Sequence, residues 1–493
     1  MVAPDEGLHR AGVRKDGALM PRTLAVHQTR IPGLLVVDLP VLGDARGWFK
    51  ENWHREKMIQ LGLPDFTPVQ NNISFNASAG STRGMHAEPW DKLVSLASGR
   101  IFGAWVDLRQ GPGFGSSFAL ELDTDQAVFV PRGVANGYQA LAPDTVYSYL
   151  VNEHWTPEAR DSYTYLNLAD PTIAIPWPIS LLQAEVSDAD REHPSLCDVT
   201  PMAPRSIVVV GANGQLGRAL MAMLPDAVGL TRPDFDLSDA ETLDTVRWGD
   251  VGLIVNAAAY TAVDTAETEE GRRICWATNV SGLRALVERA RAHRIPFVHI
   301  SSDYVFDGTT EVHSEEEPIS PLGVYGQTKA AGEALVSTLP QHWIVRTSWL
   351  IGDGSNFIRT MARLADTGVS PQVVNDQFGR LTFAEDLASG VMHLATHAPP
   401  GTYHLSNAGP VRSWAQIASL VFQFRGRPAS DVLPITTAEF TAGSRAAPRP
   451  RYSTLSLAKT ITSGFSPPCA DERLAEYLST IPLPGRNDAA QSG

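Results

Sequence analysis

The feature that most constrains the fold is a glycine-rich turn that follows an apolar run. Residues 207–217 read IVVVGANGQLG, in which four β-branched residues precede the glycines and a helical pattern follows. Such glycines let the backbone bend tightly and approach a pyrophosphate, which the N-terminus of the next helix stabilises. The pattern predicts a dinucleotide-binding site, with an ordinary strand-to-helix turn as the alternative. The predicted cofactor-binding residues of this turn are Gly211, Asn213, Gly214, Gln215, Leu216 and Gly217.

Strand-like and helical patterns alternate after this turn. Apolar runs at 253–260, 296–306 and 342–351 are separated by helical patterns such as VSGLRALVERARAH at 280–293. Strands that alternate with helices predict a parallel sheet with right-handed crossovers. Residues 205–485 are therefore expected to form an α/β Rossmann domain of the extended short-chain dehydrogenase type, followed by a polar tail at 486–493.

The part of the chain before residue 205 has a different sequence pattern. Short apolar runs such as LLVVDL, IFGAWVDL and TVYSYLV recur between Gly, Pro, Asn and Asp residues at intervals of roughly 8–12 residues. This spacing predicts an all-β sandwich or barrel over residues 21–198. Residues 199–204 are expected to be a linker, and residues 1–20 a disordered tail. The protein is thus predicted to be multidomain.

Composition excludes several classes of protein. The net charge of −14 gives no basic surface for nucleic acid or an anionic membrane. The three cysteines are far apart, which argues against a zinc site or a disulfide framework and fits a reducing compartment. We see no signal peptide and no run of about 18 apolar residues. A cytoplasmic enzyme is expected, and no metal ligands are predicted.

A tyrosine and a lysine four residues apart suggest reductase chemistry. Tyr325 and Lys329 lie in YGQTK, and this spacing places both on one face of a helix. An ammonium near a tyrosine lowers the pKa of the phenol and suits it to exchange a proton with a carbonyl oxygen. Ser302 follows an apolar strand, at the edge of the sheet where α/β proteins place their sites. For the pentapeptide YGQTK taken alone, the alternative to a catalytic site is an ordinary surface helix.

The residues after the second predicted strand bear on the choice of cofactor. The strand is expected to end near Thr231. Arg232 can pair with a 2′-phosphate, which favours NADPH, whereas Asp234 or Asp236 can bind a free ribose, which favours NADH. We expect NADPH and keep NADH as the alternative.

Residues 205–480 resemble dTDP-4-dehydrorhamnose reductases. The resemblance implies that Ser302, Tyr325 and Lys329 are catalytic, with serine in place of the usual threonine. It implies cofactor contacts at Ala257, Ala258, Tyr260, Thr261, Tyr325 and Lys329, and substrate contacts at Asp303, Tyr304 and Trp349. Some members bind Mg²⁺. The usual G-x-P-T motif is GRLT (379–382) here. The matching segments are GANGQLG, VNAAAYTAVDTAE (255–267), SSDYVFDG (301–308), VYGQTKAAGE (324–333), VRTSWLIG (345–352), NDQFG (375–379) and PRPRYSTL (448–455).

The β-rich half carries polar and aromatic residues in short clusters. These include RGWFKE (46–51), VQNNIS (69–74) and RGMH (83–86). Arginine and aromatic side chains that project into a small barrel can hold a base and a diphosphate. The alternative for each of these residues, taken alone, is an ordinary surface or core side chain with no role in binding.

Residues 25–200 resemble dTDP-4-dehydrorhamnose 3,5-epimerases, which are cupin-type jelly rolls. Further matching segments are VPRGVANGYQAL (130–141), TVYSYL (145–150), DPTIAIPWP (170–178) and VSDAD (186–190). The resemblance implies that His86 is a base oriented by Asp190, that Lys92 stabilises an enolate oxygen, and that Tyr149 is the acid on the opposite face. The residues implied to hold the thymidine diphosphate are Arg46, Phe49, Glu51, Gln70, Asn72 and Arg83.

Three departures from the epimerase pattern bear on its activity. Asn136 is at a position where the family usually has histidine, and Trp155 is at one where it usually has tyrosine. The loop between His86 and Lys92 is several residues shorter than is usual in the family. We still expect an active epimerase, because all four reacting groups are present.

Together the resemblances imply a bifunctional enzyme that epimerises and then reduces a dTDP-4-keto sugar to dTDP-L-rhamnose. A homodimer through the β domain is expected. The alternatives are the opposite C4 stereochemistry, which gives a 6-deoxy-L-talose nucleotide, and a non-catalytic NADP-binding regulatory subunit.

Overall fold

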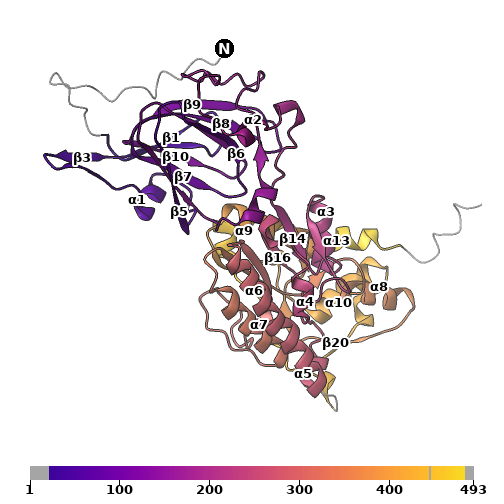
Figure 1. Ribbon diagram of the computed structural model, residues 1–493. Coiled ribbons are helices and arrows are strands. Elements are labelled where there is room, and N and C mark those ends of the chain that lie inside the picture. Colours follow the sequence, from indigo (N-terminus) through magenta and orange to yellow (C-terminus); the bar gives the residue numbers. More distant parts are fainter. Residues whose placement is uncertain (1–21, 443–445, 483–493) are drawn as a thin grey trace, which may run out of the picture. The chain divides into compact units, whose positions relative to one another are not determined.

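The computed structural model describes residues 22–442 and 446–482, and the chain divides into two compact units between Pro204 and Arg205 (Figure 1). The tails predicted at 1–20 and 486–493 lie outside the described residues. Two residues assigned from sequence to the linker, Val199 and Met202, are buried in the core of the first unit, because the backbone of Met202 pairs with that of Leu108 at 2.8 Å.

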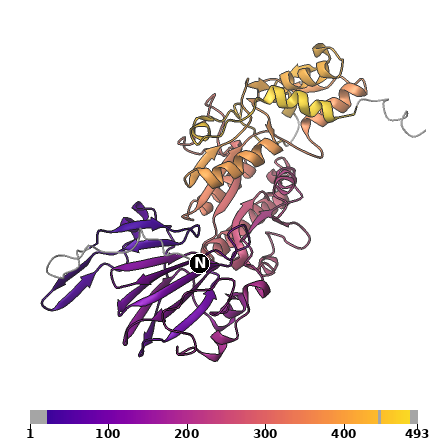
Figure 2. The same cartoon turned by 90° about the horizontal axis from the view of Figure 1, so that it is seen from above.

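The first unit is a sandwich of two antiparallel sheets (Figure 2). The six-stranded sheet has the order β1 (Ala25–Gln28), β2 (Leu35–Asp38), β10 (Gln126–Val130), β7 (Lys92–Ser98), β12 (Thr145–Val151) and β5 (Gln70–Asn76). The five-stranded sheet has the order β13 (Thr164–Tyr165), β6 (Thr82–Ala87), β11 (Val134–Ala140), β8 (Ile101–Asp107) and β9 (Ser117–Leu122). The all-β prediction is confirmed.

Side chains from both sheets form one core. Along β9, alternate residues Phe118, Leu120 and Leu122 point inward, as expected for a strand with one solvated face. They pack in one cluster with Val36 of β2 and Val94 of β7. The two sheets therefore enclose a common interior, and polar side chains at one end of it line a cavity.

A hairpin and an edge strand expose apolar side chains on this unit. The hairpin arm, residues 41–50, pairs β3 (Val41–Asp44) with β4 (Gly47–Lys50) and extends outward ahead of α1 (Arg55–Gln60) (Figure 1). Phe49 of the arm is 66% exposed. On the edge strand β5, Ile73 and Phe75 are 66% and 59% exposed. Both the arm and the edge strand therefore present apolar side chains to solvent.

The second unit is a parallel sheet with helices on both faces, which confirms the Rossmann-type prediction. The strand order is β15 (Val228–Leu230), β14 (Ser206–Val210), β16 (Val251–Asn256), β17 (Phe297–Ser302), β18 (His342–Thr347) and β23 (Gly401–His404). The chain passes from β14 first to β15 on one side and later to β16 on the other. Ligands of such sheets bind at this switch point, beyond the carboxyl ends of the strands.

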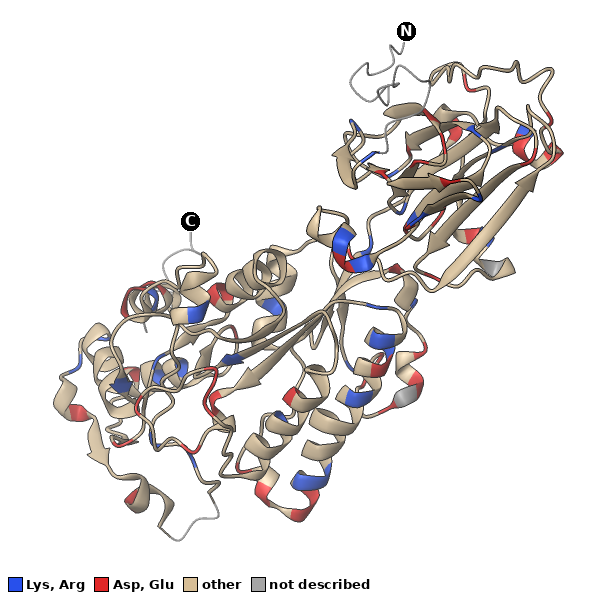
Figure 3. Ribbon diagram, turned by 90° about the vertical axis from the view of Figure 1, so that its left-hand side faces the viewer, with Lys and Arg blue, Asp and Glu red and all other residues tan. Residues whose placement is uncertain are grey.

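Apolar stripes fix the helices to the sheet. Helices α3 (Gln215–Met223) and α9 (Ala384–His397) share one buried cluster with β14 and β16. Helices α6 (Leu283–Ala292) and α7 (Val324–Val336) share a second cluster with these strands, and α5 (Glu269–Trp276) packs beside α7. Acidic and basic residues are interspersed along the outer helices (Figure 3). Within the described residues, no helix is long and apolar enough to span a bilayer.

The C-terminal part of this unit has its own small core. It is built by α8 (Phe357–Asp366), α10 (Trp414–Phe424) and α13 (Ala470–Thr480), with β20 (Gln372–Val374) pairing β25 (Leu433–Ile435). The remaining short elements of both units are α2 (Asp188–Arg191), α4 (Ala240–Leu243), β19 (Leu350–Ile351), β21 (Phe378–Gly379), β22 (Thr382–Phe383), β24 (Arg412–Ser413), α11 (Thr437–Thr441) and α12 (Ala458–Thr462).

Candidate active sites

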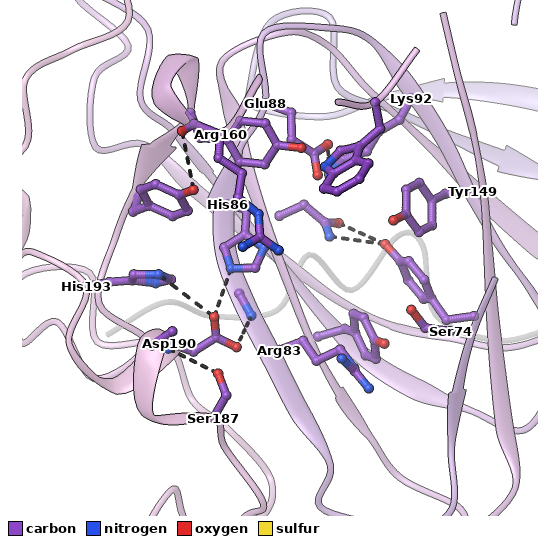
Figure 4. Close-up of a pocket in the computed structure, with 18 of the residues that line it drawn as sticks. Ser74, Arg83, His86, Glu88, Lys92, Tyr149, Arg160, Ser187, Asp190 and His193 are labelled. Atoms are coloured by element: carbon purple, nitrogen blue, oxygen red, sulfur yellow. Dashed lines mark hydrogen bonds and ion pairs between the residues drawn. The ribbon is translucent and has the colours of Figure 1, made fainter. Parts of the chain in front are cut away.

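The first unit holds a cavity of about 650 Å³ that is lined by residues of both sheets (Figure 4). His86 enters it from β6 of the five-stranded sheet. Lys92 and Tyr149 enter it from β7 and β12 of the six-stranded sheet. A flat ligand between the sheets therefore meets the imidazole on one face and the phenol on the other.

The imidazole of His86 is oriented by a carboxylate. Its Nε2 lies 2.9 Å from Oδ1 of Asp190, whose Oδ2 accepts the Gly84 N–H at 3.3 Å. Burial tends to raise the pKa of Asp190, but the hydrogen bonds from His86 and Gly84 outweigh it and lower the pKa. Gly84 has a φ of +117°, and a Cβ there would lie 2.8 Å from the carbonyl oxygen of Asn136. The glycine of RGMH thus lets the strand bring His86 to its carboxylate.

The phenol and ammonium of the opposite sheet are tightly enclosed. Burial, and then the negative charge of Glu88, raise the pKa of Tyr149 to about 12, so this phenol is protonated at neutral pH. Nζ of Lys92 lies 6.0 Å from the centroid of the Tyr149 ring. It is also 2.5 Å from Oε2 of Glu88, and both side chains are nearly buried. A proton donor and a fixed cation therefore face the cavity together.

Glu88 and His193 are two of the cavity residues that sequence reasoning missed. Glu88, in the loop after β6, forms an ion pair with Lys92 at the start of β7, and no sequence signal indicated this contact. His193 stacks on Tyr165 and lies 5.3 Å from the His86 ring between centroids. Ligand atoms of His86, Asp190 and His193 lie within 4.8 Å of one another, so these are side chains of the described part that could hold a metal ion.

The predicted substrate residues divide into two groups. Arg83 lines the cavity, and Gln70 and Asn72 hydrogen-bond to each other on β5 at 2.8 Å. Of the six residues, only Arg83 is among those that line the cavity. Arg46 and Phe49 belong to the exposed hairpin arm, and Glu51 pairs outside the cavity with Lys57 at 2.7 Å.

The structure shows what the three departures from the epimerase pattern do. Asn136 is buried, and its Nδ2 donates to the hydroxyl of Tyr147 at 3.1 Å. Trp155 lines the cavity with its ring near the guanidinium of Arg160. The short loop brings Glu88 to Lys92. All three changes keep the cavity polar and aromatic.

In the second unit, the glycine-rich turn lies at the switch point of the sheet. Gly211 has a φ of +81°, and a Cβ there would lie 2.8 Å from the backbone nitrogen of Ala258. The N-cap residue Gly214 offers no side chain to the first turn of α3, which leaves its N–H groups available to an anion. The turn therefore fits a pyrophosphate. Leu216 packs in the core, so only its backbone can face a ligand.

The residues after β15 differ in their availability to a ligand. Arg232 is exposed one residue beyond Thr231, where the strand has ended. Asp236 accepts hydrogen bonds from both the N–H and the hydroxyl of Ser238, at 2.9 Å and 2.7 Å. Its carboxylate is thus engaged within the chain, whereas the Arg232 side chain is in solvent.

The segment 257–261 is held beside this turn by a residue that sequence reasoning missed. Asn279 Oδ1 accepts the Tyr260 N–H at 2.7 Å, and its Nδ2 donates to the Tyr260 carbonyl at 3.2 Å. Asn279 lies in a π-helical stretch, Ala277–Gly282, which is a frequent feature of functional sites. Tyr260 and Tyr325 pack on the same small cluster, and Ala257 and Ala258 follow the end of β16.

The predicted catalytic groups of the reductase are brought together. Ser302 Oγ donates to Asp303 Oδ1 at 2.8 Å and accepts the Tyr304 N–H at 3.2 Å. The rings of Tyr304 and Tyr325 meet edge to face, with centroids 5.4 Å apart. Burial raises the pKa of Asp303 to about 6, against the hydrogen bonds of two serines.

The pKa of Tyr325 is raised in this structure and not lowered, as the spacing to Lys329 had led us to expect. Burial, and then the charge of Asp303, raise the pKa of Tyr325, against a hydrogen bond with Ser302. The Nζ of Lys329 donates to the Ile300 carbonyl at 2.6 Å and lies 3.3 Å from Nε2 of His299. Desolvation, which a spacing pattern does not include, is the largest influence on the pKa of Tyr325.

Trp349 lies after β18 and packs against the C-terminal core. Its ring stacks on Trp414, with centroids 3.8 Å apart. Leu381, where the family pattern has proline, is buried in the C-terminal core, and the hydroxyl of Thr382 donates to the Ser348 carbonyl at 2.5 Å. Hydrophobic packing and a side-chain hydrogen bond thus hold the segment without the proline.

Comparisons with known proteins match each unit to a family. The family described as RmlD substrate binding domain matches residues 205–482, and the family dTDP-4-dehydrorhamnose 3,5-epimerase matches residues 28–198. Protein RmlC homolog of Streptococcus pyogenes serotype M6 is 49% identical over 182 residues, which are 36% of this chain and 91% of that protein. dTDP-4-dehydrorhamnose reductase of Sinorhizobium fredii is 38% identical over 300 residues, which are 57% of this chain and 99% of that protein. A crystal structure of dTDP-4-dehydrorhamnose reductase from Bacillus anthracis in complex with NADP is 34% identical, with a TM-score of 0.52, and covers 56% of this chain and 99% of that one.

Proposed function

The chain belongs to the RmlD substrate binding domain family through residues 205–482 and to the dTDP-4-dehydrorhamnose 3,5-epimerase family through residues 28–198, and from this premise we propose that it catalyses two successive steps of dTDP-rhamnose biosynthesis. The first unit converts dTDP-4-dehydro-6-deoxy-D-glucose to dTDP-4-dehydro-L-rhamnose. The second unit reduces the C4 ketone to give dTDP-L-rhamnose.

The observation that carries the epimerase proposal is the opposition of His86 and Tyr149 across one cavity. A C4 ketone acidifies the hydrogens at C3 and C5, and a neutral imidazole held by Asp190 can remove them. The ammonium of Lys92 stabilises the enolate oxygen. Tyr149 is protonated and comes from the other sheet, so it donates its own proton to the opposite face and inverts the carbon, while the removed proton stays on His86 until solvent exchange restores both groups.

The reductase proposal rests on Ser302 and Tyr325 beside the switch point. The Ser302 hydroxyl, which donates to Asp303 in the free protein, turns to donate to the C4 oxygen, and Tyr325 donates a proton to that oxygen. The raised pKa of Tyr325 suits this direction, because the donor must be protonated when the reaction starts. Asp303, Tyr304 and Trp349 position the sugar.

We infer NADPH as the cofactor, which supplies hydride to C4 when it is bound. The glycine turn and the N-terminus of α3 hold its pyrophosphate, and the exposed Arg232 pairs with its 2′-phosphate. Asp236 is engaged with Ser238, so NADH has the weaker binding site. The Bacillus anthracis relative binds NADP.

A homodimer of the first unit would account for the position of Arg46, Phe49 and Glu51, which do not line the cavity of their own copy. The hairpin arm exposes Phe49, and the edge strand β5 exposes Ile73 and Phe75. We propose that the arm of each copy packs against the other copy. Arg46, Phe49 and Glu51 then complete the cavity of the second copy.

The function is tested by incubating the protein with dTDP-4-dehydro-6-deoxy-D-glucose and NADPH in D₂O. We expect deuterium at C3 and C5, oxidation of NADPH, and a rhamnose nucleotide by NMR. His86→Ala should block deuterium entry and leave NADPH binding intact. A 6-deoxy-L-talose product would reverse the proposed C4 stereochemistry. No isotope exchange and no NADPH oxidation would overturn both activities.

A further inference from the structure

The helix that carries Tyr325 and Lys329 begins without a cap of its own. Helix α7 starts at Val324, and its N-cap residue, Gly323, has no side chain to accept a hydrogen bond. Its first turn also contains no acidic residue. The first N–H groups of a helix have no partner within the helix, and the N-terminus carries a partial positive charge. An acceptor for this end of α7 must therefore come from another segment or from water.

Glu267 supplies this acceptor from the segment that follows the predicted cofactor residues 257–261. Its Oε1 accepts the Val324 N–H at 2.8 Å, although the two residues are 57 positions apart in the sequence. The carboxylate also places a negative charge at the positive end of the helix, where it is stabilising. Because Val324 directly precedes Tyr325, this contact fixes the turn that carries the proton donor.

The space for the carboxylate depends on Gly323. A Cβ at this position would lie 2.7 Å from Oε1 of Glu267, which is closer than these two atoms can approach. A larger residue at position 323 therefore displaces the carboxylate from the Val324 N–H. The glycine at the N-cap and the glutamate from the distant segment are thus two parts of one arrangement.

The segment that presents Glu267 is itself held in place. Ala266 is fully buried and shares a small apolar cluster with Val324, against which the ring of Tyr325 packs. The Glu267 N–H donates to the Asp264 carbonyl at 3.2 Å, within one turn of 3₁₀ helix. The carboxylate therefore comes from an ordered turn that already contacts the start of α7.

We propose that Glu267 is a positioning residue of the reductase, which caps α7 from outside the helix and so holds Tyr325 in place for proton transfer. The proposal deepens the proposed reductase function and rests on it for its catalytic consequence. One short stretch of chain, residues 257–267, then carries both the cofactor contacts and the cap of the catalytic helix.

The cap is tested by amide hydrogen exchange of single residues in the full-length protein, without substrate. Loss of an N-cap favours opening of the first turn by roughly three- to 30-fold. Glu267→Ala should speed exchange by this factor at Val324 and at Gln327, whose N–H makes the first bond within the helix to the Gly323 carbonyl. The control is Glu269→Ala, which removes an exposed carboxylate two residues further on and should change neither amide. Exchange of the Val324 amide within about twofold of wild type in Glu267→Ala overturns the proposal.

Two changes at Gly323 separate the loss of a cap from a general loss of packing. Gly323→Ala displaces the carboxylate and offers no acceptor, so its effect and that of Glu267→Ala should not multiply in the double variant. Gly323→Ser places a hydroxyl at an N-cap whose backbone is already extended, so it should restore slow exchange in the Glu267→Ala background. Effects that multiply, or a serine that does not restore slow exchange, overturn the proposal.

The catalytic consequence is measured as oxidation of NADPH by the 4-keto sugar. Glu267→Ala should lower kcat by roughly threefold or more, and Gly323→Ser should restore it in that background. The KM for NADPH should stay in place, because the glycine turn at 211–217 lies in another segment. An unchanged kcat beside faster exchange overturns the positioning role. If the wild-type protein reduces no sugar, the proposed function fails, whereas the exchange rates still decide whether Glu267 caps α7.

Discussion

Replacing Asp190 by asparagine tests the base of the epimerase site with the smallest change in shape. The carboxylate accepts from His86 at 2.9 Å and from the Gly84 N–H at 3.3 Å. When the imidazole takes a proton from C3 or C5, the negative charge of Asp190 stabilises the resulting imidazolium. A hydrogen bond to a charged partner contributes about 1.5–3 kcal/mol. Because each 1.36 kcal/mol is tenfold in rate, we expect Asp190→Asn to slow proton removal by roughly ten- to 150-fold.

The assay is entry of solvent deuterium into the 4-keto sugar, followed by mass spectrometry without NADPH. Asp188→Asn is the matched control, since Asp188 belongs to the same short helix, loses the same charge and is exposed. It should exchange at the wild-type rate. The reasoning fails if Asp190→Asn exchanges within about twofold of wild type, or if both variants lose exchange equally.

Three further changes test other parts of the chain. Tyr325→Phe should lower reduction by roughly 10²–10⁴-fold, the usual contribution of a general acid, while deuterium exchange continues; an unchanged rate of NADPH oxidation rejects the acid. Glu88→Gln should leave Lys92 as an unpaired buried cation and lower the free energy of unfolding, measured in urea, by roughly 3–5 kcal/mol. Combining Glu88→Gln with Lys92→Met should restore stability. Equal losses in the single and double variants would contradict the ion pair. The pKa of Asp303 is raised to about 6, so the folded state loses about 3 kcal/mol of stability as the pH rises from about 4 to 6. Asp303→Asn should remove this loss. Identical profiles of stability against pH for wild type and variant would reject the reasoning.

Contiguous patterns were predicted well from sequence, for a physical reason. The turn at 211–217 depends on backbone space within one short segment, and the inward residues of β9 follow the two-residue period of a strand. The two-sheet and parallel-sheet classes follow from such local patterns. The grouping of Ser302, Tyr304 and Tyr325 follows from the rule that sites gather at the carboxyl ends of parallel strands.

Contacts between distant segments were not predictable in the same way. Asn279 holds the backbone of Tyr260, and nothing in the sequence around Asn279 indicates this partner. Glu88 is close to Lys92 in sequence, but it lies in a loop, where a four-residue spacing does not predict a contact. The pKa of Tyr325 is raised and not lowered because burial, which a spacing pattern does not contain, has the largest effect.

The outward position of the hairpin arm has a genetic consequence if two copies exchange arms as proposed. Each epimerase centre is then assembled from two polypeptides, one giving His86 and the other giving Phe49. Two inactive variants, His86→Ala and Phe49→Asp, therefore complement each other when they are coexpressed. In a mixed dimer, one epimerase centre receives an intact His86 from one copy and an intact Phe49 from the other. Neither variant alone forms such a centre.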